Sequence, residues 1–325
     1  MTIIKSEFAL ALNQIATERG ISLEEVIDSI EEAVKIAYKK EYHIEEMEEI
    51  LVKIDPKTGG ARLFQEDKDI TPPGFGRIAA QTAKQVIIQK IREAEKKSVV
   101  QHFKKLERSL ITGRVIRFDG KIAYVDIGRT EAVLPPSEQI RNERYYPNTR
   151  LVFYLMEVID VPGMYKIILS RKDERLIQEL FRREVPELAQ GMVEIRKIVR
   201  EAGERTKIAV YSKERGVDPV GSCVGQKGVR IQSVIHSLSI DEKIDVVQWS
   251  EDQKTFITNA ISPSKPIEVE IHEEEKLANI FVDSEELPLI IGREGQNIRL
   301  ASKLTGYTLK AQPKEEQIGT VKADL

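Results

Sequence analysis

One pattern, a Gly-x-x-Gly turn between two helix-forming segments, occurs twice in this chain and constrains its fold more than any other feature. The first copy spans residues 218–239, with its turn at 225–228. The second copy spans residues 284–305, with its turn at 292–295, so the two turns start 67 residues apart (225 to 292). A repeat of this length corresponds to a whole small domain, which predicts two tandem modules.

The turn has the chemistry of a site for a phosphodiester backbone. Its glycines let the main chain adopt angles that other residues avoid, and they leave no side chain between the turn and an approaching polymer. The helix that follows points its unpaired N–H groups and its positive dipole end at the same place. In the first copy, Lys227 and Arg230 add positive charge. A single such turn more often closes an ordinary helix pair, so it is the repetition that favours binding.

The segments around the two turns also match. Strand-like runs occupy residues 193–200, 206–211 and 243–249 around the first turn, and 266–272, 277–283 and 307–311 around the second. The order helix, strand, strand, helix, turn, helix, strand resembles KH domains of the prokaryotic (type II) topology. This resemblance implies that each turn clamps about four nucleotides of single-stranded RNA.

Composition limits the other possibilities. The 325 residues suffice for several domains, and 41% of them are hydrophobic. The net charge of −3 means that any RNA contact must come from local patches. A single cysteine excludes a disulfide framework and a cysteine-cluster metal site. No run of 18 apolar residues and no secretory signal is present, so we expect a soluble, cytoplasmic protein.

Residues 1–108 form a first module without a Gly-x-x-Gly turn. We predict a helix at residues 6–19 and a second helix that starts with a capping box at Ser22 and Glu25. One face of the second helix is apolar, through Val26, Ile30, Ala33, Val34 and Ala37. The opposite face is acidic, through Glu24, Glu25, Asp28, Glu31 and Glu32, and residues 45–49 continue the charge. This acidic face is either simply solvated or a surface for a basic protein partner, and it would repel RNA.

The rest of the first module combines a hairpin and a long helix. Two strands are predicted at residues 50–54 and 61–64, followed by an uninterrupted helix at residues 77–106. The helix has an apolar side with Ile78, Val86, Ile87, Ile91 and Ala94, and a basic second half. Such a helix suits a spacer or a docking arm.

Residues 109–172 contain five short strand-like runs. These runs are 113–117, 123–128, 131–135, 151–158 and 166–170. Five short strands in about 60 residues indicate an OB-type barrel, and their order of motifs resembles the S1-like class of that fold. Such barrels stack bases on aromatic rings and pair phosphates with cations. The candidate residues here are Arg114, Arg117, Phe118, Lys121 and Tyr124, with Arg129 nearby. Core packing is as good an explanation for either aromatic ring.

A helix over residues 173–188 joins the barrel to the first KH-like module, and the polar tail after Ala311 completes the chain. We therefore divide the chain into 1–108, an S1-like barrel at 109–172, and KH modules at 173–251 and 252–325. The fold class is multi-domain α+β: a mixed α/β N-terminal module, an S1-like OB barrel and two tandem type II KH domains. This order of modules resembles the NusA family of bacterial transcription termination/antitermination factors. The closest segments are DPVGSCVGQKGVRIQSV, EKIDVVQWS and IIGREGQNIRLASKLTGY.

The resemblance implies a function that the residue patterns alone do not reach. It implies that the N-terminal module docks on RNA polymerase, that the other modules contact nascent single-stranded RNA, and that the factor modulates pausing, termination and antitermination. Other antitermination factors are implied as further partners. We expect a monomer without membrane association. Some members of the family carry an acidic repeat domain after the second KH module. None follows here, and we do not extend the functions of that domain to this chain.

The resemblance carries over to particular residues at the two turns. The first turn supplies Gly225, Gln226, Lys227 and Gly228, with Arg230 after it, and the second supplies Gly292, Arg293, Glu294, Gly295, Gln296, Asn297 and Arg299. Glu294 is unfavourable beside a phosphate, and we expect Arg293 and Arg299 to offset it. We interpret Cys223 as a small core residue without redox chemistry.

We find no sign of catalysis in the sequence. The four histidines are scattered without metal-ligand spacing, and no nucleophile or phosphate-loop signature occurs. We expect no catalytic residues, no metal and no cofactor. The alternative function is an RNA-processing or ribosome-associated protein that uses the same S1 and KH modules.

Overall fold

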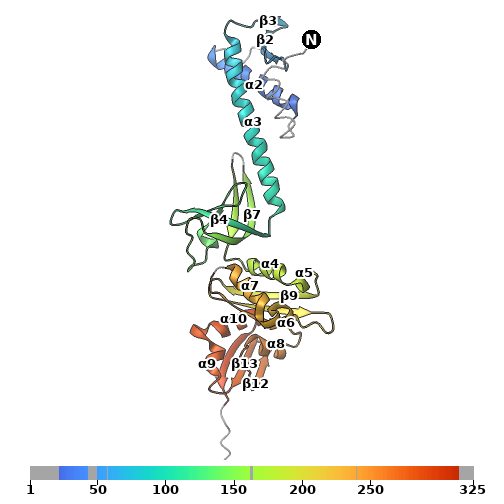
Figure 1. Cartoon of the computed structure of the whole chain (residues 1–325), viewed down its shortest axis with the longest axis vertical. Helices are drawn as coiled ribbons and strands as arrows, with labels where there is room; N and C mark the ends of the chain where they lie inside the picture. Colours follow the sequence, from blue (N-terminus) through green and yellow to red (C-terminus); the bar gives the residue numbers. More distant parts are fainter. Residues whose placement is uncertain (1–21, 43–49, 57, 162–163, 239, 315–325) are drawn as a thin grey trace, which may run out of the picture. The chain divides into compact units, whose positions relative to one another are not determined.

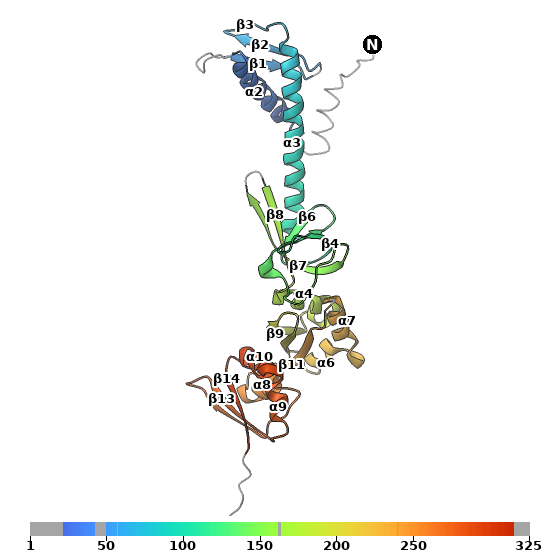
Figure 2. The ribbon, with the colours of Figure 1, turned by 90° about the vertical axis from the view of Figure 1, so that its left-hand side faces the viewer.

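The computed structural model describes residues 22–42, 50–56, 58–161, 164–238 and 240–314. The chain divides into two compact units, Met1–Lys105 and Leu106–Leu325 (Figures 1 and 2). The predicted helix at 6–19 and the acidic run at 45–49 lie outside the described residues.

The first unit packs two helices against a small antiparallel sheet. Its elements are α2 (Leu23–Glu41), β1 (Ile50–Ile54), β2 (Ala61–Gln65), β3 (Lys68–Asp69) and α3 (Phe75–Lys105), with sheet order β1-β2-β3. The alternating pattern of β1 buries Ile50, Val52 and Ile54. The two predicted strands are confirmed, whereas the two-residue β3 was not predicted.

The apolar face predicted for α2 is mostly confirmed. Val26, Ile30 and Val34 have no exposed surface, and Tyr38 continues the same row. The capping box is wrong, because the Ser22 side chain makes no capping hydrogen bond. On the acidic face, Glu31 accepts a hydrogen bond from the backbone N–H of Ile54 at 2.8 Å, so this carboxylate ties the helix to β1.

The long helix α3 contacts the core only partly through the residues predicted. Val86 and Ile87, from the predicted apolar side, pack at the margin of the core. Phe75, Ala79 and Ala83, which were not predicted, follow one another at intervals of four and are buried. The stripe of α3 that faces the core therefore overlaps the predicted side without coinciding with it.

The second unit begins with a closed five-stranded barrel, as predicted. Its strands are β4 (Leu110–Phe118), β5 (Ala123–Asp126), β6 (Glu131–Leu134), β7 (Arg150–Val161) and β8 (Met164–Ser170), in the order β4-β5-β6-β8-β7. Ala123 and Val125 face the barrel core, so Tyr124 between them points outward, as its position in the alternation predicted.

A broken helix follows the barrel. The structure has α4 (Glu174–Glu184) and a single turn α5 (Pro186–Ala189) where one continuous helix over 173–188 was predicted. Pro186 has no backbone N–H and its ring clashes with the preceding turn, so it starts the second segment.

Two units of the same topology complete the chain. The first consists of β9 (Val193–Glu201), β10 (Arg205–Ser212), α6 (Pro219–Val224), α7 (Val229–Leu238) and β11 (Lys243–Gln248). The second consists of α8 (Gln253–Ala260), β12 (Glu268–His272), β13 (Leu277–Val282), α9 (Leu287–Ile291), α10 (Gln296–Thr305) and β14 (Thr308–Pro313). In each sheet the middle strand pairs antiparallel with the first strand and parallel with the last. The tandem repeat is confirmed.

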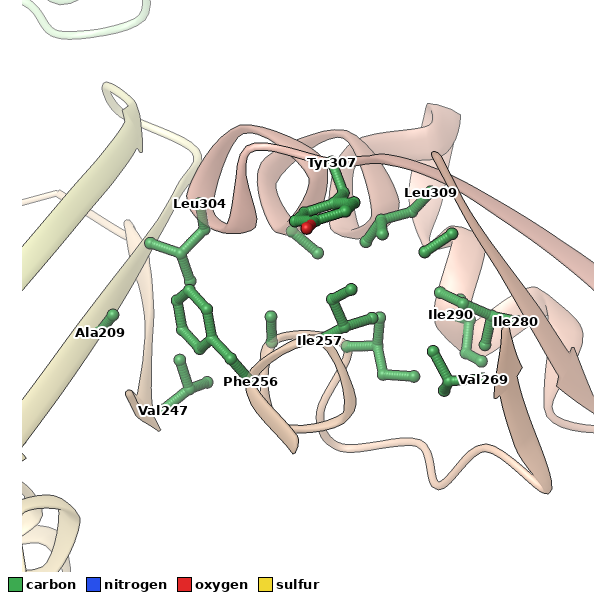
Figure 3. Packing of buried hydrophobic residues seen from close by; sticks show 14 of the residues in the cluster. Ala209, Val247, Phe256, Ile257, Val269, Ile280, Ile290, Leu304, Tyr307 and Leu309 are labelled. Atoms are coloured by element: carbon green, nitrogen blue, oxygen red, sulfur yellow. The ribbon is translucent and has the colours of Figure 1, made fainter. Parts of the chain in front are cut away.

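The two repeat units share a hydrophobic core. On β10, Ile208 and Val210 face the helices of their own unit, whereas Ala209 between them faces the second unit. Ala209 and Val247 pack with Phe256 of α8 and Leu304 of α10 (Figure 3). The first sheet is therefore covered on both faces, once by its own helices and once by the second unit.

The barrel is joined to the first repeat unit by two buried arginines. Arg171 has no exposed surface and donates to Glu143 and to the carbonyl of Val152 in the barrel, and to the carbonyl of Leu238 in α7. Arg200 in β9 donates to the carbonyl of Arg171 at 2.9 Å. Because a buried guanidinium that loses its partners is strongly destabilising, these hydrogen bonds favour this arrangement of the joint.

Candidate nucleic-acid interface

The two Gly-x-x-Gly turns have the same backbone geometry. Gly225 and Gly292 have φ/ψ of 76°/171° and 71°/176°. The third residue of each turn is left-handed although it is not glycine: Lys227 has φ 51° and ψ 24°, and Glu294 has φ 52° and ψ 27°. Left-handed non-glycine residues are uncommon and concentrate at functional sites. The chain has built one local structure twice.

The first glycine of each turn is required by space. A Cβ at Gly225 would lie 2.8 Å from Cγ of Arg230, and a Cβ at Gly292 would lie 2.8 Å from Cβ of Asn297. Each partner lies five residues after its glycine, on the helix that follows. Any side chain at this position would push the turn away from the N-terminus of the helix that follows.

The glycine at the fourth position of each turn leaves the main chain open to an approaching polymer. A Cβ at Gly295 would meet nothing within 4 Å, and one at Gly228 would meet only a methyl of Ile231, at 3.9 Å. The two glycines have φ of 72° and 78°, so backbone angle accounts for their identity. A polymer backbone can approach the main chain closely at these points.

The side chains at the tips of the turns are exposed. Gln226 and Lys227 project from the first turn, and Arg293 and Glu294 are 92% and 84% exposed on the second. Of the two residues expected to offset the unfavourable carboxylate, Arg299 pairs with Glu201, whereas Arg293 lies 3.9 Å from Glu294 and offsets it in part. Exposure of both charges leaves this pair little stabilising effect.

Four candidate residues on the helices that follow the two turns have partners elsewhere in the protein. Arg230 donates to both Glu187 oxygens, at 3.0 and 2.8 Å, and to the carbonyl of Ser222 at 2.6 Å. It thereby ties α7 to the end of α6. Asn297 has no exposed surface, and its amide donates to the carbonyl of Ile290 at 3.1 Å. Because it is buried, Asn297 supports the second turn from behind and we withdraw it as an RNA contact.

The other two residues, Gln296 and Arg299, hold the second repeat unit against the first repeat unit. Arg299 makes two hydrogen bonds of 2.8 Å to the carboxylate of Glu201, at the end of β9. Gln296 donates to Glu201 at 3.0 Å and to Glu204 at 2.8 Å. The Arg299 guanidinium also donates to the carbonyl of Glu294, which fixes the second turn to this ion pair. The bonds from Arg299 hold the pKa of Glu201 below its usual range.

The five barrel candidates are all at least partly exposed. The guanidinium of Arg117 lies 3.3 Å from the ring centre of Tyr124, and Arg114 pairs with Asp126 at 3.0 Å. Lys121 is exposed beside them, and Phe118 exposes 42% of its surface. The stacked Arg117 occupies one face of the tyrosine ring, so a base could stack on that face only after Arg117 moves.

Three exposed apolar residues beside the turns were not predicted, and the third, Ile291, is 37% exposed directly before the second turn. Val229 directly follows the first turn and is 64% exposed, and Leu289 precedes the second and is 55% exposed. The first turn and Val229 border a groove of about 790 Å³ that extends to Asp218 and Gly221. The sequence signal that could have indicated Val229 is an apolar residue at the first position of a helix, where packing does not require one.

The described residues give no support for a metal site, a membrane span or a reactive thiol. No group of three histidine, cysteine or carboxylate residues there could hold a metal ion. No helix in that part of the chain is long and apolar enough to span a membrane. Cys223 is buried, and burial raises the pKa of its thiol to about 12, which agrees with a packing role.

The barrel and the two repeat units with matching turns define a class, the multi-domain RNA-binding proteins with tandem KH domains. Family models match the chain as the NusA N-terminal domain (residues 7–72 and 66–97), the NusA-like first KH domain (171–249) and the NusA-like second KH domain (253–318). This chain belongs to the NusA family.

Individual relatives are similar in sequence over almost the whole chain. The NusA transcription termination/antitermination protein of Halalkalibacterium halodurans is 39% identical over 97% of this chain and 91% of its own length. That of Bacillus subtilis is 38% identical over 99% and 95%, and that of Thermus thermophilus 37% over 95% and 90%. Among solved structures, the N-terminal domain of NusA from B. subtilis covers 29% of this chain and 99% of that domain, at 32% identity and a TM-score of 0.25.

Proposed function

We propose that this protein is a transcription elongation factor that docks on RNA polymerase through residues 1–108 and holds nascent single-stranded RNA with the barrel and the two KH domains. In this role it modulates pausing, termination and antitermination. The observation that carries the RNA contact is the duplicated turn, with exposed tips and main chain open to a backbone. The relatives are transcription termination/antitermination proteins by name, which supports the role in termination and antitermination.

We further propose that the N-terminal module binds protein and not RNA. Four carboxylates are exposed in the first three turns of α2: Glu24, Glu25, Asp28 and Glu32. Beside them, Ile36 exposes 62% of its surface, and Leu51 exposes 59% on β1. Exposed apolar side chains near an acidic row suit a basic protein surface and would repel phosphates.

This division of labour predicts separable binding. Residues 1–108 should bind RNA polymerase without RNA, and residues 110–325 should bind single-stranded RNA without polymerase. Pull-down of polymerase and fluorescence anisotropy with labelled RNA, each on both fragments, measure the two activities. Equal RNA affinity of the two fragments would contradict the division.

The first turn offers a direct test of the RNA contact. Changing Gln226→Asp together with Lys227→Asp should weaken RNA binding about 10- to 100-fold, the contribution of one or two hydrogen bonds to charged groups. Folding should be unaffected, because both side chains are exposed and carboxylates suit a helix N-terminus.

The chain contains a matched control for this variant. Gln253 and Lys254 form the same dipeptide in the first turn of α8, outside either Gly-x-x-Gly turn. Gln253→Asp with Lys254→Asp makes the same change in charge and should leave RNA affinity nearly unchanged. If both variants lose affinity equally, net charge and not the turn is responsible.

A further inference from the structure

The ends of strands β7 and β8 form a two-stranded ribbon that extends beyond the rest of the barrel (Figures 1 and 2). The ribbon consists of residues 159–161 of β7 and 164–166 of β8, and Asp160 pairs with Tyr165 at its centre. Two strands alone have no core of their own and are marginally stable in water. The side chains that such a ribbon presents to solvent are therefore expected to be polar.

The hydrogen bonds of the barrel end where the ribbon begins. On one edge, the pairing of β4 with β7 ends at Tyr154, and the carboxylate of Glu107 accepts a hydrogen bond from the backbone N–H of Val158 at 2.6 Å. On the other edge, β6 pairs with β8 at Ile168. Within the described part of the barrel, neither neighbouring strand thus pairs with the ribbon.

One face of the ribbon is turned toward the barrel. Val158 and Ile167, the cross-strand pair next to the ribbon, are buried. Because side chains alternate along a strand, Asp160 and Tyr165 lie on this same face. The hydroxyls of Tyr165 and Thr130 share a hydrogen bond of 2.8 Å, which ties the ribbon to the turn between β5 and β6.

The opposite face of the ribbon is apolar and open to solvent. Ile159 exposes 37% of its surface, Val161 41% and Met164 47%. The register puts all three side chains on this face, together with Lys166, which is exposed directly across from Ile159. Threonine would suit the strand backbone at these positions as well, so strand formation alone does not account for apolar residues there. Apolar residues grouped on a protruding surface indicate a contact with another molecule.

The small size of this apolar face limits what can bind there. A stable protein interface buries about 800 Å² on each partner, far more than three partly exposed side chains supply. A second copy of this chain, held by this face alone, would therefore dissociate. The face can contribute only to a complex that another contact already holds together, because that contact gives the second one a high effective concentration.

The first unit of the chain provides such a contact. Residues 1–108 are proposed above to dock on RNA polymerase. The long helix α3 of this unit ends at Lys105, and the first strand of the barrel starts at Leu110. A connection this short keeps the barrel near any protein that the first unit binds.

We propose that the apolar face of the ribbon is a second, weaker contact with RNA polymerase. Its partner is an apolar protein surface with a carboxylate that faces Lys166. On docking, Ile159, Val161 and Met164 lose their remaining contact with water. The proposal rests on the polymerase docking proposed above and adds a contact outside the N-terminal module.

The test is full-length protein with Ile159→Thr and Met164→Thr, titrated with RNA polymerase core enzyme in the absence of RNA. Threonine keeps the β propensity of both positions and removes apolar surface. Affinity should fall about 10-fold, because both side chains lose the burial of their exposed parts. The matched control, Ile116→Thr with Ile267→Thr, removes two apolar side chains of similar exposure, 42% and 48%, elsewhere in the second unit and should bind like the wild type.

Two further measurements locate the contact. The photo-reactive residue benzoylphenylalanine in place of Met164 should cross-link to a polymerase subunit, whereas the same residue in place of Ile267 should not. Lys166→Glu should also weaken binding, and by less at high salt, because salt screens the repulsion between two carboxylates. Circular dichroism and RNA affinity, both expected to match the wild type, report whether each variant is folded.

The outcomes are distinct. If the wild-type protein does not bind polymerase, the proposed function itself fails. If it binds and the Ile159→Thr, Met164→Thr variant binds equally well, with no cross-link from position 164, polymerase docking stands and the ribbon is not part of it. A folded variant that loses RNA affinity instead would make the ribbon an RNA contact, and a wild-type dimer that the variant does not form would make it a surface for self-association. Either result would overturn the proposal.

Discussion

An RNA of about ten unpaired nucleotides is expected to bind at least about 100 times more tightly than one of four, because the two turns act on one strand. Each turn alone engages about four nucleotides, which gives weak binding in a protein of net charge −3. Once the first turn is occupied, the second is held at high effective concentration. The gain for linked sites of this kind is on the order of 10² to 10⁴.

The structure explains why this gain should be large. Glu201 of the first KH domain makes two hydrogen bonds of 2.8 Å to Arg299 of the second. Lys197 donates to the carbonyl of Lys303 across the same joint, and the hydrophobic core continues across it. A rigid joint fixes the distance between the two turns, so little orientational freedom is lost when the second turn binds.

A length series by fluorescence anisotropy measures this coupling. The wild type is compared with a variant in which Arg293→Asp and Glu294→Asp are combined, because Asp tolerates the left-handed backbone at position 294. The variant should lose the gain with length while keeping its affinity for the shortest RNA. Folding the longer RNA into a hairpin should remove most of the gain, and higher salt should lower affinity throughout. Shallow growth of affinity with length, identical in both proteins, would show that the turns act independently.

The second large effect concerns stability. Glu242 is buried and accepts two hydrogen bonds of 2.8 Å from Arg200, one of 2.6 Å from Thr206 and one of 2.9 Å from the backbone N–H of Gly203. Glu242→Gln keeps the shape and removes the charge, which leaves Arg200 buried without a counterion. Breaking one member of a buried pair costs about 3–5 kcal/mol of unfolding free energy.

Urea unfolding followed by Trp249 fluorescence measures this loss. The control is Glu268→Gln, in an exposed pair with Lys314 at 3.0 Å, for which about 0–1 kcal/mol is expected. A loss at Glu242 no larger than at Glu268 would mean that the joint tolerates an unpaired arginine.

The pH dependence of the same variant provides an additional check. Burial alone would raise the pKa of Glu242, but the hydrogen bonds from Arg200, Thr206 and Gly203 outweigh it and hold the pKa below 4.5. The charged form therefore stabilises the fold above pH 4.5, and this stabilisation is lost as the pH falls through the lowered pKa. The difference in unfolding free energy between wild type and variant should shrink below pH 4.5.

Much of this architecture could be predicted because the signals are local. Alternating apolar residues locate the strands, and the paired glycines locate the turns to the residue. Even the break at Pro186 was available in the sequence, although a continuous helix was predicted there. Ala79 and Ala83 of α3 show the limit of local patterns, because this helix has more apolar residues than it buries and its sequence does not say which of them face the core.

The partners of the site residues could not be predicted, because they lie far away along the chain. Arg299 and Gln296 look like free polar residues at the start of a helix, and only the fold brings Glu201 to them from almost 100 positions earlier. Arg230 and Glu187 are likewise 43 residues apart. The sequence position of a residue after a Gly-x-x-Gly turn thus shows that the residue lies near the site. It does not show whether the side chain faces the ligand or supports the turn.

The sheet that is covered on both faces has a consequence for how the chain folds. Cutting the chain after Ser250 would keep every strand and helix of the first KH domain, yet it would uncover Ala209 and Val247. Water would then reach an apolar surface that the second domain normally covers, which favours self-association. The two KH domains are separate in sequence, but their shared core leads us to expect that they unfold as one cooperative block, so that neither is a natural fragment for study alone.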